Sequence, residues 1–490
     1  MTIIIGSTYL VWHFLELWHS PSFVGFSFLG IEIFISICSL FYWRTLLFDE
    51  SEQSFLTQRS IKLDAKIDIL IPTADENRDV LEKTIDSARL IQGMTKVYVL
   101  DDGKRDWLKN LCIEKDVVYV RREGSENAKA GNLNHALSFL ESEFALILDA
   151  DIIAKPEIIL TAMPHFKDET VAIVQFPQEY SNLDSFQHWT EGRPWHDLSF
   201  GLIKVNPCRN FIKASYWVGS PSIIRISAIK QIGGVQTGSV TEDVQTTIAL
   251  MTAGMWIKSL KEIKATGLAP HDYESYCIQR QRWSKGFFQL WWSKHSPLKQ
   301  NLSLAAKIEW IGDFFYHMHM SFYFLVIQLL PCLIFIFKDE TIIESKTGLI
   351  FWAVSFSLMN ITNRILGGPL FRMIPFQTYM RLAMFPIIWG FIESIPLFKN
   401  EIFEVTPKAK SHKLKSRTII YVILFSGLIL INSITLAAVI LQAQKSNYDV
   451  SVFFVALWCS ANLFYLGLGA IKIMTTNSLN LFPIKLEQYE

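Results

Sequence analysis

Two aspartates that share one spacer residue, Asp149 and Asp151, follow the apolar run 145–148. An apolar run of strand length that ends in acidic residues predicts a buried parallel strand, and open α/β sheets bind ligands at the carboxyl ends of such strands. Side chains of an extended chain alternate between two faces, so both carboxylates can hold one hard cation, Mg²⁺ or Mn²⁺, with a diphosphate as its third partner. Solvated turns and helix caps show the same spacing, so other residues must decide between these interpretations.

A second acidic pair, Asp101 and Asp102, ends the predicted strand 96–100 and is followed by Gly103. A carboxylate at this place can accept hydrogen bonds from a base or ribose, and glycine permits close approach of a nucleotide. An Asp-Gly turn explains these residues equally well. Lys129 opens a predicted helix, where its charge and the free backbone amides can hold phosphate.

The sequence Thr-Glu-Asp at 241–243 precedes another predicted helix. Its acids, Glu242 and Asp243, can simply cap that helix, which is the usual reason for acidic residues in a first turn. The alternative is catalytic. Transfer of a group to a hydroxyl needs a carboxylate that takes the proton as the new bond forms, and Asp243 is a candidate for this general base.

The sequence Gln-Arg-Gln-Arg-Trp at 279–283 combines two guanidiniums, Arg280 and Arg282, with the indole of Trp283. The guanidiniums can neutralise a leaving diphosphate, and the indole offers a sugar ring an apolar platform. A basic stretch that binds anionic lipid beside a membrane would explain the arginines but not the glutamines between them.

The composition indicates that part of the chain lies in lipid. Of its 490 residues, 50% are hydrophobic, and the mean hydropathy is +0.25, which is too apolar for a soluble globular protein. The 46 basic and 46 acidic residues cancel. This balance argues against nucleic acid as a partner, because a nucleic-acid-binding protein needs a basic excess to neutralise phosphates.

Strands alternate with helices through the middle of the chain, and this alternation predicts a doubly wound parallel sheet in a Rossmann-like α/β domain. Polar residues follow three of the strands, at 73–76, 101–103 and 149–151. Three acidic strand ends in one sheet predict a nucleotide pocket. The predicted strands are 66–72, 96–100, 116–120, 145–148 and 170–175, and the predicted helices are 78–91 and 128–142.

Apolar runs of membrane-spanning length flank this domain. Residues 2–18 and 23–43 predict a helical hairpin. Glu16 and Glu32 should face neighbouring helices or a polar lumen, because a lipid-facing carboxylate is costly. Further spans are predicted at 317–337, 348–366, 418–442 and 451–471.

Basic residues in the connections set the predicted topology. They cluster around the run 376–398, which contains Pro386 and Pro396 and is interpreted as an interfacial or re-entrant helix. Six spans then result, with the α/β domain and both termini in the cytoplasm and the protein in the plasma (inner) membrane. The predicted division is a transmembrane hairpin at 1–45, the cytoplasmic domain with interfacial helices at its end at 46–300, and a channel region at 301–490.

Taken in order, these motifs resemble those of the processive family 2 glycosyltransferases, and most closely those of the cellulose synthase catalytic subunits. A further stretch at 403–408 is similar to the Phe-x-Val-Thr-x-Lys gating loop of cellulose synthases, which closes over the donor. The resemblance covers most of the chain. It implies a GT-A fold inserted between transmembrane helices, a divalent metal, a UDP-sugar donor, a growing polysaccharide as acceptor, and surrounding membrane lipids. The matching gating-loop residues are Phe403, Val405, Thr406 and Lys408, within the loop 399–417.

The resemblance also implies a role for each matching residue. Asp243 would be the general base, and Glu76 and Asp101 would contact the uridine. The implied donor-binding residues are Thr73, Glu76, Asp101, Asp102, Lys129, Asp149, Gln279, Arg280 and Arg282. The implied acceptor-binding residues are Gly219, Ser220, Glu242 and Trp283, and the implied metal ligands are Asp149 and Asp151.

Four positions depart from the family pattern. They surround the donor and the acceptor, and the acidic residues of the motifs are unchanged. They bear on the linkage and the identity of the polymer rather than on catalysis. The expected function is polymerisation of a β-glucan from UDP-glucose with secretion through the protein's own helices, without the cyclic-dinucleotide-binding domain of many bacterial cellulose synthases. Alternatives are a chitin- or hyaluronan-like synthase that uses UDP-N-acetylglucosamine, a non-processive lipid glycosyltransferase, or an inactive channel or scaffold. The departures are Ala74, Ile152, Phe176 and Val218.

Overall fold

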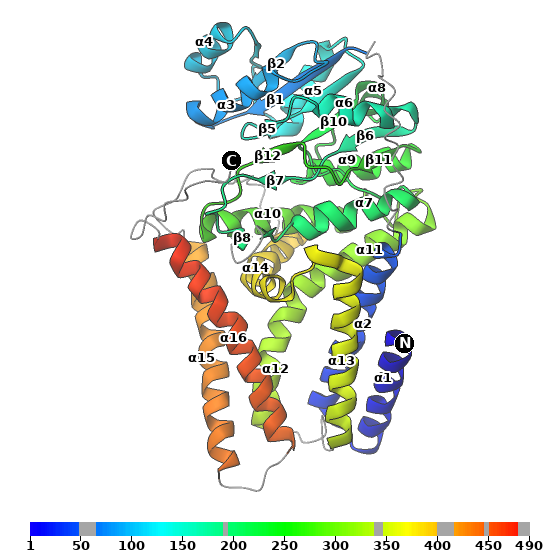
Figure 1. Ribbon diagram of the computed structural model, residues 1–490, viewed down its shortest axis with the longest axis vertical. Helices are drawn as coiled ribbons and strands as arrows, with labels where there is room; N and C mark the ends of the chain where they lie inside the picture. The colour runs from blue at the N-terminus through cyan, green and yellow to red at the C-terminus, as the bar shows by residue number, and fades with distance from the viewer. Residues whose placement is uncertain (49–64, 190–194, 338–345, 399–415, 445–449, 479–490) are drawn as a thin grey trace.

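A computed structural model describes residues 1–48, 65–189, 195–337, 346–398, 416–444 and 450–478. An α/β domain lies at one end of the molecule and a bundle of long helices at the other (Figure 1). Two helices, α10 (Tyr273–Trp292) and α14 (Met373–Ser394), lie between these two parts. The molecule therefore has three layers: the domain, the two helices at the junction, and the bundle.

The α/β domain is organised around a seven-stranded sheet with the order β11-β6-β10-β4-β1-β2-β3. Its strands are β1 (Ile67–Thr73), β2 (Val97–Asp101), β3 (Val118–Val120), β4 (Phe144–Ile147), β6 (Val171–Gln175), β10 (Ser222–Arg225) and β11 (Trp256–Ser259). β10 runs antiparallel to both β4 and β6, and the other pairs are parallel. The prediction of an entirely parallel sheet is therefore wrong at β10, because a four-residue strand with only two apolar residues, Ile223 and Ile224, gives too short a pattern to be identified from sequence.

Helices cover both faces of this sheet. Ile67 and Ile69 of β1 pack on one face against α3, α4 and α6, whereas Leu70 packs on the other against α5, α8 and α9. All three side chains are fully buried. The doubly wound arrangement is confirmed, since alternate residues of a buried strand enter opposite layers of the core. The helices are α3 (Arg78–Arg89), α4 (Asp106–Glu114), α5 (Ala128–Phe139), α6 (Ile158–Ala162), α8 (Ile226–Gln231) and α9 (Glu242–Thr252).

Short strands join the main sheet to α10. A three-stranded sheet has the order β5-β12-β7, and β8 and β9 pair as an antiparallel ribbon. β5 begins two residues after Asp151, and β12 ends directly before Leu268, so this small sheet brings those two residues together. The strands are β5 (Ile153–Ala154), β7 (Glu179–Tyr180), β8 (His188–Trp189), β9 (Trp195–His196) and β12 (Ala265–Gly267).

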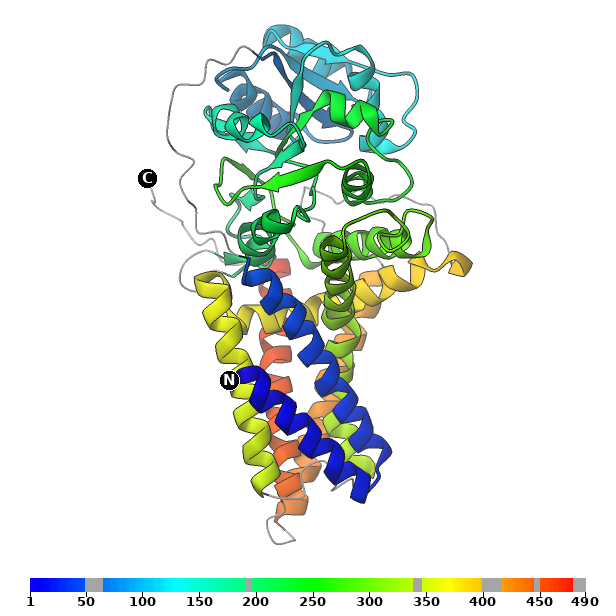
Figure 2. The ribbon, with the colours of Figure 1, turned by 90° about the vertical axis from the view of Figure 1, so that its right-hand side faces the viewer.

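Five helices in the described part of the chain are long and apolar enough to cross a membrane. The candidate after the domain begins at residue 304, earlier than the predicted 317, and includes both α11 and α12. Helix α1 (Thr2–His19) is not among the five, although it packs against α2 and α13 (Figure 2). That α1 spans the membrane stays a prediction. The bundle helices are α2 (Phe23–Leu46), α11 (Leu304–Met318), α12 (Phe324–Phe337), α13 (Lys346–Gly367), α15 (Ser416–Ala443) and α16 (Val450–Ser478).

The two acidic residues of the N-terminal hairpin differ in their environment. Glu32 of α2 is buried and accepts hydrogen bonds from the hydroxyl of Tyr9 at 2.6 Å and from Nδ1 of His13 at 2.7 Å, both on α1. This network satisfies the carboxylate away from lipid, as predicted. Glu16 lies on the exposed side of α1, so it does not face a neighbouring helix, and the alternative that it faces a polar lumen stays a prediction. The residue is one turn from the helix end, where a long side chain reaches the interface.

Helix α14 crosses the junction close against α10. The hydroxyl of Tyr273 donates to the carbonyl of Leu382 at 3.1 Å, and that of Ser284 donates to the carbonyl of Ile387 at 2.8 Å. A Cβ at Gly390 would lie 2.4 Å from the carbonyl oxygen of Gln281, so the close approach requires glycine there. α14 is not one of the five candidate spans, in keeping with the predicted interfacial helix. Its depth in a membrane stays a prediction.

A buried ionic cluster ties the α/β domain to the bundle. Arg209 donates to Asp313 on α11 at 2.5 and 2.8 Å, and its Nε lies 3.4 Å from Glu309 on the same helix. Glu309 also pairs with Arg44 of α2 and accepts from the hydroxyl of Thr45 at 2.7 Å. Because both carboxylates and Arg209 are shielded from water, the cluster holds the domain in a defined place on the helices.

Candidate functional site

The strand β4 delivers Asp149 and Asp151 to the edge of the sheet. The amide of Asp149 donates to the hydroxyl of Ser220 at 2.8 Å, and its carboxylate accepts from Nζ of Lys129 at 2.5 Å. Asp151 is 7% exposed, and its Oδ2 accepts from the amide of Leu268 at 2.9 Å. The predicted strand thus ends where expected, with a lysine beside the more exposed aspartate.

That Asp149 and Asp151 hold a divalent cation, completed by a diphosphate, stays a prediction. Within the described ranges, no group of three or more His, Cys, Asp or Glu side chains is placed to hold a metal. Mg²⁺ binds commonly through one or two carboxylates together with substrate phosphates and water, and Asp149 and Asp151 offer that number of hard oxygen ligands. The ammonium of Lys129 on Asp149 shows that the site favours positive charge.

Around the end of β2, Asp101 is held by a residue that the sequence interpretation missed, Arg105. The guanidinium of Arg105 donates to Asp101 at 2.8 Å and 3.1 Å and to the hydroxyl of Thr73 at 2.8 Å. Asp101 also accepts from Tyr119 at 3.0 Å, and Glu76 accepts from Thr73 at 2.5 Å. Asp101, Thr73 and Glu76 are thus brought together as predicted, and Arg105 joins them. The only sequence signal for this arginine is its position four residues after Asp101.

Asp102 has a second missed partner, Arg122, which donates to it at 2.6 and 2.7 Å. The same guanidinium donates to the backbone carbonyls of Glu126 at 2.9 Å and Ala128 at 3.1 Å. Asp102 therefore fixes the loop that leads into α5 and thereby places Lys129. Its direct contact with a donor stays a prediction.

The general-base candidate Asp243 lies in the first turn of α9. Its Oδ1 accepts from the amide of Val244 at 2.8 Å, so it satisfies part of the helix end as the capping interpretation proposed. Burial, and then the charge of Glu242, raises the pKa of Asp243 to about 7. Such a pKa suits a group that must take a proton near neutral pH.

Lys129 and Gly219 connect this base to the aspartates of β4. A Cβ on Gly219, whose φ is +86°, would lie 3.3 Å from Nζ of Lys129 and 3.6 Å from Oδ2 of Asp243. The glycine turn therefore passes close to both charges, and a side chain there would be strained and would crowd them. Burial lowers the pKa of Lys129, but the charges of Asp149, Glu242 and Asp243 outweigh it and raise the pKa. The three carboxylates thus act on one ammonium.

The two arginines of α10, Arg280 and Arg282, have different charged neighbours. Burial lowers the pKa of Arg282, opposed by the charges of Glu242, Asp243 and Asp149, so Arg282 belongs to the cluster around the base. Arg280 instead donates to Asp197 at 2.7 Å. Residues two apart on a helix point to different sides, and that both arginines contact the diphosphate stays a prediction.

The remaining predicted residues are on α10 and in the turn that precedes β10. Gln279 of α10 is 9% exposed, and Trp283 lies with its ring centroid 4.8 Å from the guanidinium carbon of Arg280. Ser220 is fully buried under β4. Beside Ser220, the buried Trp217 belongs to the core, and its Nε1 donates to Ser222 at 2.8 Å.

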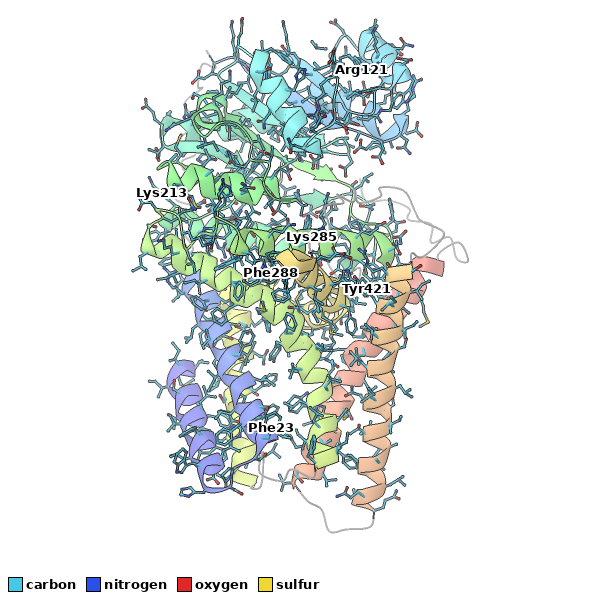
Figure 3. The ribbon with its side chains drawn as sticks, turned by 180° about the vertical axis from the view of Figure 1, so that it is seen from behind. Phe23, Arg121, Lys213, Lys285, Phe288 and Tyr421 are labelled. Carbon is cyan, nitrogen blue, oxygen red and sulfur yellow. The ribbon has the colours of Figure 1, made fainter. Side chains whose placement is uncertain are left out.

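The gating-loop residues Phe403, Val405, Thr406 and Lys408 lie outside the described residues. The helices on either side of that loop meet at α10. Glu393 of α14 accepts from Gln281 of α10 at 2.9 Å and lies 3.5 Å from Arg417 of α15 and 3.8 Å from Lys285 of α10. Lys285, Phe288 and Tyr421 lie at this junction, whereas Arg121 lies at the outer end of the domain and Phe23 within the bundle (Figure 3). The flank on α14 is therefore fastened to α10, the helix that carries Arg282. The flank on α15 is fastened to α14 through Arg417 and to α10 through Tyr421, whose hydroxyl donates to Gln281 at 3.1 Å.

Comparison with known proteins agrees with this fold. Residues 65–286 match the family described as glycosyltransferase like family 2. The chain is 28% identical over 331 residues to the UDP-forming cellulose synthase catalytic subunit of Xanthomonas axonopodis pv. citri, covering 64% of this chain and 45% of that protein. It is 31% identical over 254 residues to that of Pseudomonas fluorescens, covering 49% of this chain and 34% of that protein. The aligned part is less than half the length of these relatives.

Among solved structures, the chain is similar to a mannosyltransferase of Pyrobaculum calidifontis in complex with GDP-Man and Mn²⁺. The TM-score is 0.50 at 13% identity, over 81% of this chain and 99% of that one. At this identity the likeness shows the fold alone, which is GT-A.

Proposed function

We propose that the chain, whose residues 65–286 match the glycosyltransferase like family 2, is a processive, inverting glycosyltransferase of the membrane. It polymerises a β-glucan from UDP-glucose and secretes the polymer through its own transmembrane helices. The donor and the product are drawn from the cellulose synthase relatives, and the metal from the Mn²⁺ in the mannosyltransferase.

One observation carries this proposal: Asp243 lies in the same charged cluster as Lys129, Arg282 and Asp149. A base with a pKa of about 7 stands there beside two cations, Lys129 and Arg282, and the carboxylate of Asp149. Inverting transfer needs these groups together, because a proton leaves the acceptor while a diphosphate departs from the opposite face of the sugar.

The chemistry follows from these positions. An acceptor hydroxyl oxygen forms the new bond to the anomeric carbon, its proton passes to Asp243, and the bond to UDP breaks with the electron pair on the diphosphate. Lys129 and Arg282 stabilise the charge that develops on that leaving group. A divalent ion held by Asp149 and Asp151 would add further neutralisation of the diphosphate. Trp283 supports the acceptor ring.

The nucleoside end of the donor lies towards Thr73, Glu76, Asp101 and Asp102. The α/β domain and both termini face the cytoplasm of the plasma (inner) membrane, where UDP-sugars are supplied. The division at 1–45, 46–300 and 301–490 describes the hairpin, the catalytic domain and the channel region. The acceptor enters the bundle past α10 and α14.

The proposal is tested with the full chain in lipid vesicles supplied with radiolabelled UDP-sugars. We expect long polymer from UDP-glucose, cleaved by an enzyme specific for β-linked glucose. Polymer from UDP-N-acetylglucosamine instead would favour the chitin- or hyaluronan-like alternative, and single sugars on lipid would favour a non-processive transferase. Absence of UDP release with every UDP-sugar would mean an inactive channel or scaffold.

A further inference from the structure

A buried carboxylate that the sequence did not single out, Asp197, meets α10 from the loop after β9. Its Oδ2 accepts from the hydroxyl of Tyr276 at 3.0 Å and from Nη2 of Arg280 at 2.7 Å. The side chains of Asp197 and Arg280 are 2% and 11% exposed. An ion pair so shielded from water holds its geometry more firmly than a surface pair does.

Arg280 in turn is held between two aromatic rings. Tyr276, Arg280 and Trp283 are spaced by four and three residues, so they lie along one face of α10. The guanidinium carbon lies 4.7 Å from the ring centroid of Tyr276 and 4.8 Å from that of Trp283. A flat cation stacked in this way restricts where the indole can lie.

We propose that Asp197 and Arg280 are positioning residues, which hold the indole of Trp283 as the platform for the acceptor sugar. The inference rests on the proposed function, in which Trp283 binds the acceptor. It gives the two arginines of α10 separate tasks: Arg282 faces the donor cluster, and Arg280 orients the platform. The hydrogen bond from Arg280 to Asp197 fixes the orientation of the guanidinium plane, and stacking on the guanidinium fixes the position of the Trp283 indole.

The test uses full-length Asp197→Asn and Arg280→Lys variants in lipid vesicles. Asparagine keeps the shape of the carboxylate without its charge, and lysine keeps the charge without the flat face that stacks on the indole. We expect wild-type affinity for UDP, polymer synthesis about 10- to 100-fold slower, shorter chains, and more donor lost to water as free glucose. Asp86→Asn is the matched control, since it removes an ion pair between Asp86 of α3 and Lys115, the residue after α4, away from the site, and should behave as wild type.

Chains of wild-type length made at the wild-type rate by both variants would overturn the proposal. So would a loss of UDP binding in proportion to polymer synthesis, because that is the mark of a structural defect alone. Arg280→Lys keeps both buried charges and provides the measurement if Asp197→Asn does not accumulate. If the wild-type chain makes no polymer from any UDP-sugar, the proposed function fails instead.

Discussion

Replacing Glu242 by glutamine should shift the acidic limb of the pH–rate profile to lower pH. Burial, and after it the charge of Glu242, raises the pKa of Asp243 from 3.8 to about 7. A carboxyl with a raised pKa takes up its proton as the pH falls through 7, and only the ionised form accepts the proton of the acceptor. The rate should therefore fall on the acidic side of neutrality.

The size of the effect follows from that pKa. The protonated carboxyl of Asp243 is favoured by roughly 4 kcal/mol relative to one in water, at about 1.4 kcal/mol for each tenfold change in the proton equilibrium. About a tenth of the enzyme is then ionised at pH 6 and about nine tenths at pH 8, so the wild-type rate should differ about ninefold. Glutamine at 242 removes one cause and leaves burial, so a fall of one unit in the pKa of Asp243 would raise the rate at pH 6 from about a tenth to about half of its plateau.

The assay is the initial rate of UDP release, with each variant scaled to its own plateau at alkaline pH. Scaling removes any direct effect of Glu242 on acceptor binding. Glu82→Gln is the matched control, because Glu82 pairs with Lys115 on the exposed surface of the domain. An acidic limb that stays in place in Glu242→Gln, or a wild-type profile that is flat around neutrality, would refute the reasoning.

Three further substitutions test two other parts of the structure, the proposed metal site and the ionic cluster of Arg209. Asp149→Asn and Asp151→Asn should weaken UDP binding with Mn²⁺ present and hardly change it with a chelator, by calorimetry; an equal loss under both conditions would contradict a metal site. Arg209→Met should lower the free energy of unfolding by about 3 kcal/mol, because it leaves Glu309 and Asp313 buried with fewer partners. Thermal unfolding measures this against Arg78→Met, which removes only exposed pairs; equal stability of the two variants would show that the cluster is unimportant.

The sequence predicted well those elements whose pattern is local. The strand before Asp149 is an uninterrupted apolar run, and the helix from Arg78 repeats apolar residues at helical spacing, so both were found. β10 has only four residues after a Gly-Ser-Pro turn, and its antiparallel direction depends on the path of the whole chain. Direction in a sheet is a tertiary property that no short window contains.

The motif residues were found, but their ionic partners were not. Arg105, Arg122 and Asp197 carry charges typical of any surface, and only the fold brings them to Asp101, Asp102 and Arg280. The closeness of Arg280 and Arg282 in sequence likewise hides their different directions on α10. Helical spacing could have shown that Arg280 belongs with Tyr276 and Trp283.

The most direct test of the central claim is polymer synthesis by Asp243→Asn, measured together with UDP affinity on the same vesicles. Asparagine keeps the size of the side chain but cannot accept the proton. We expect synthesis to fall by about 100-fold or more while the Kd for UDP stays at the wild-type value. Synthesis at the wild-type rate would contradict the role of Asp243 as the base.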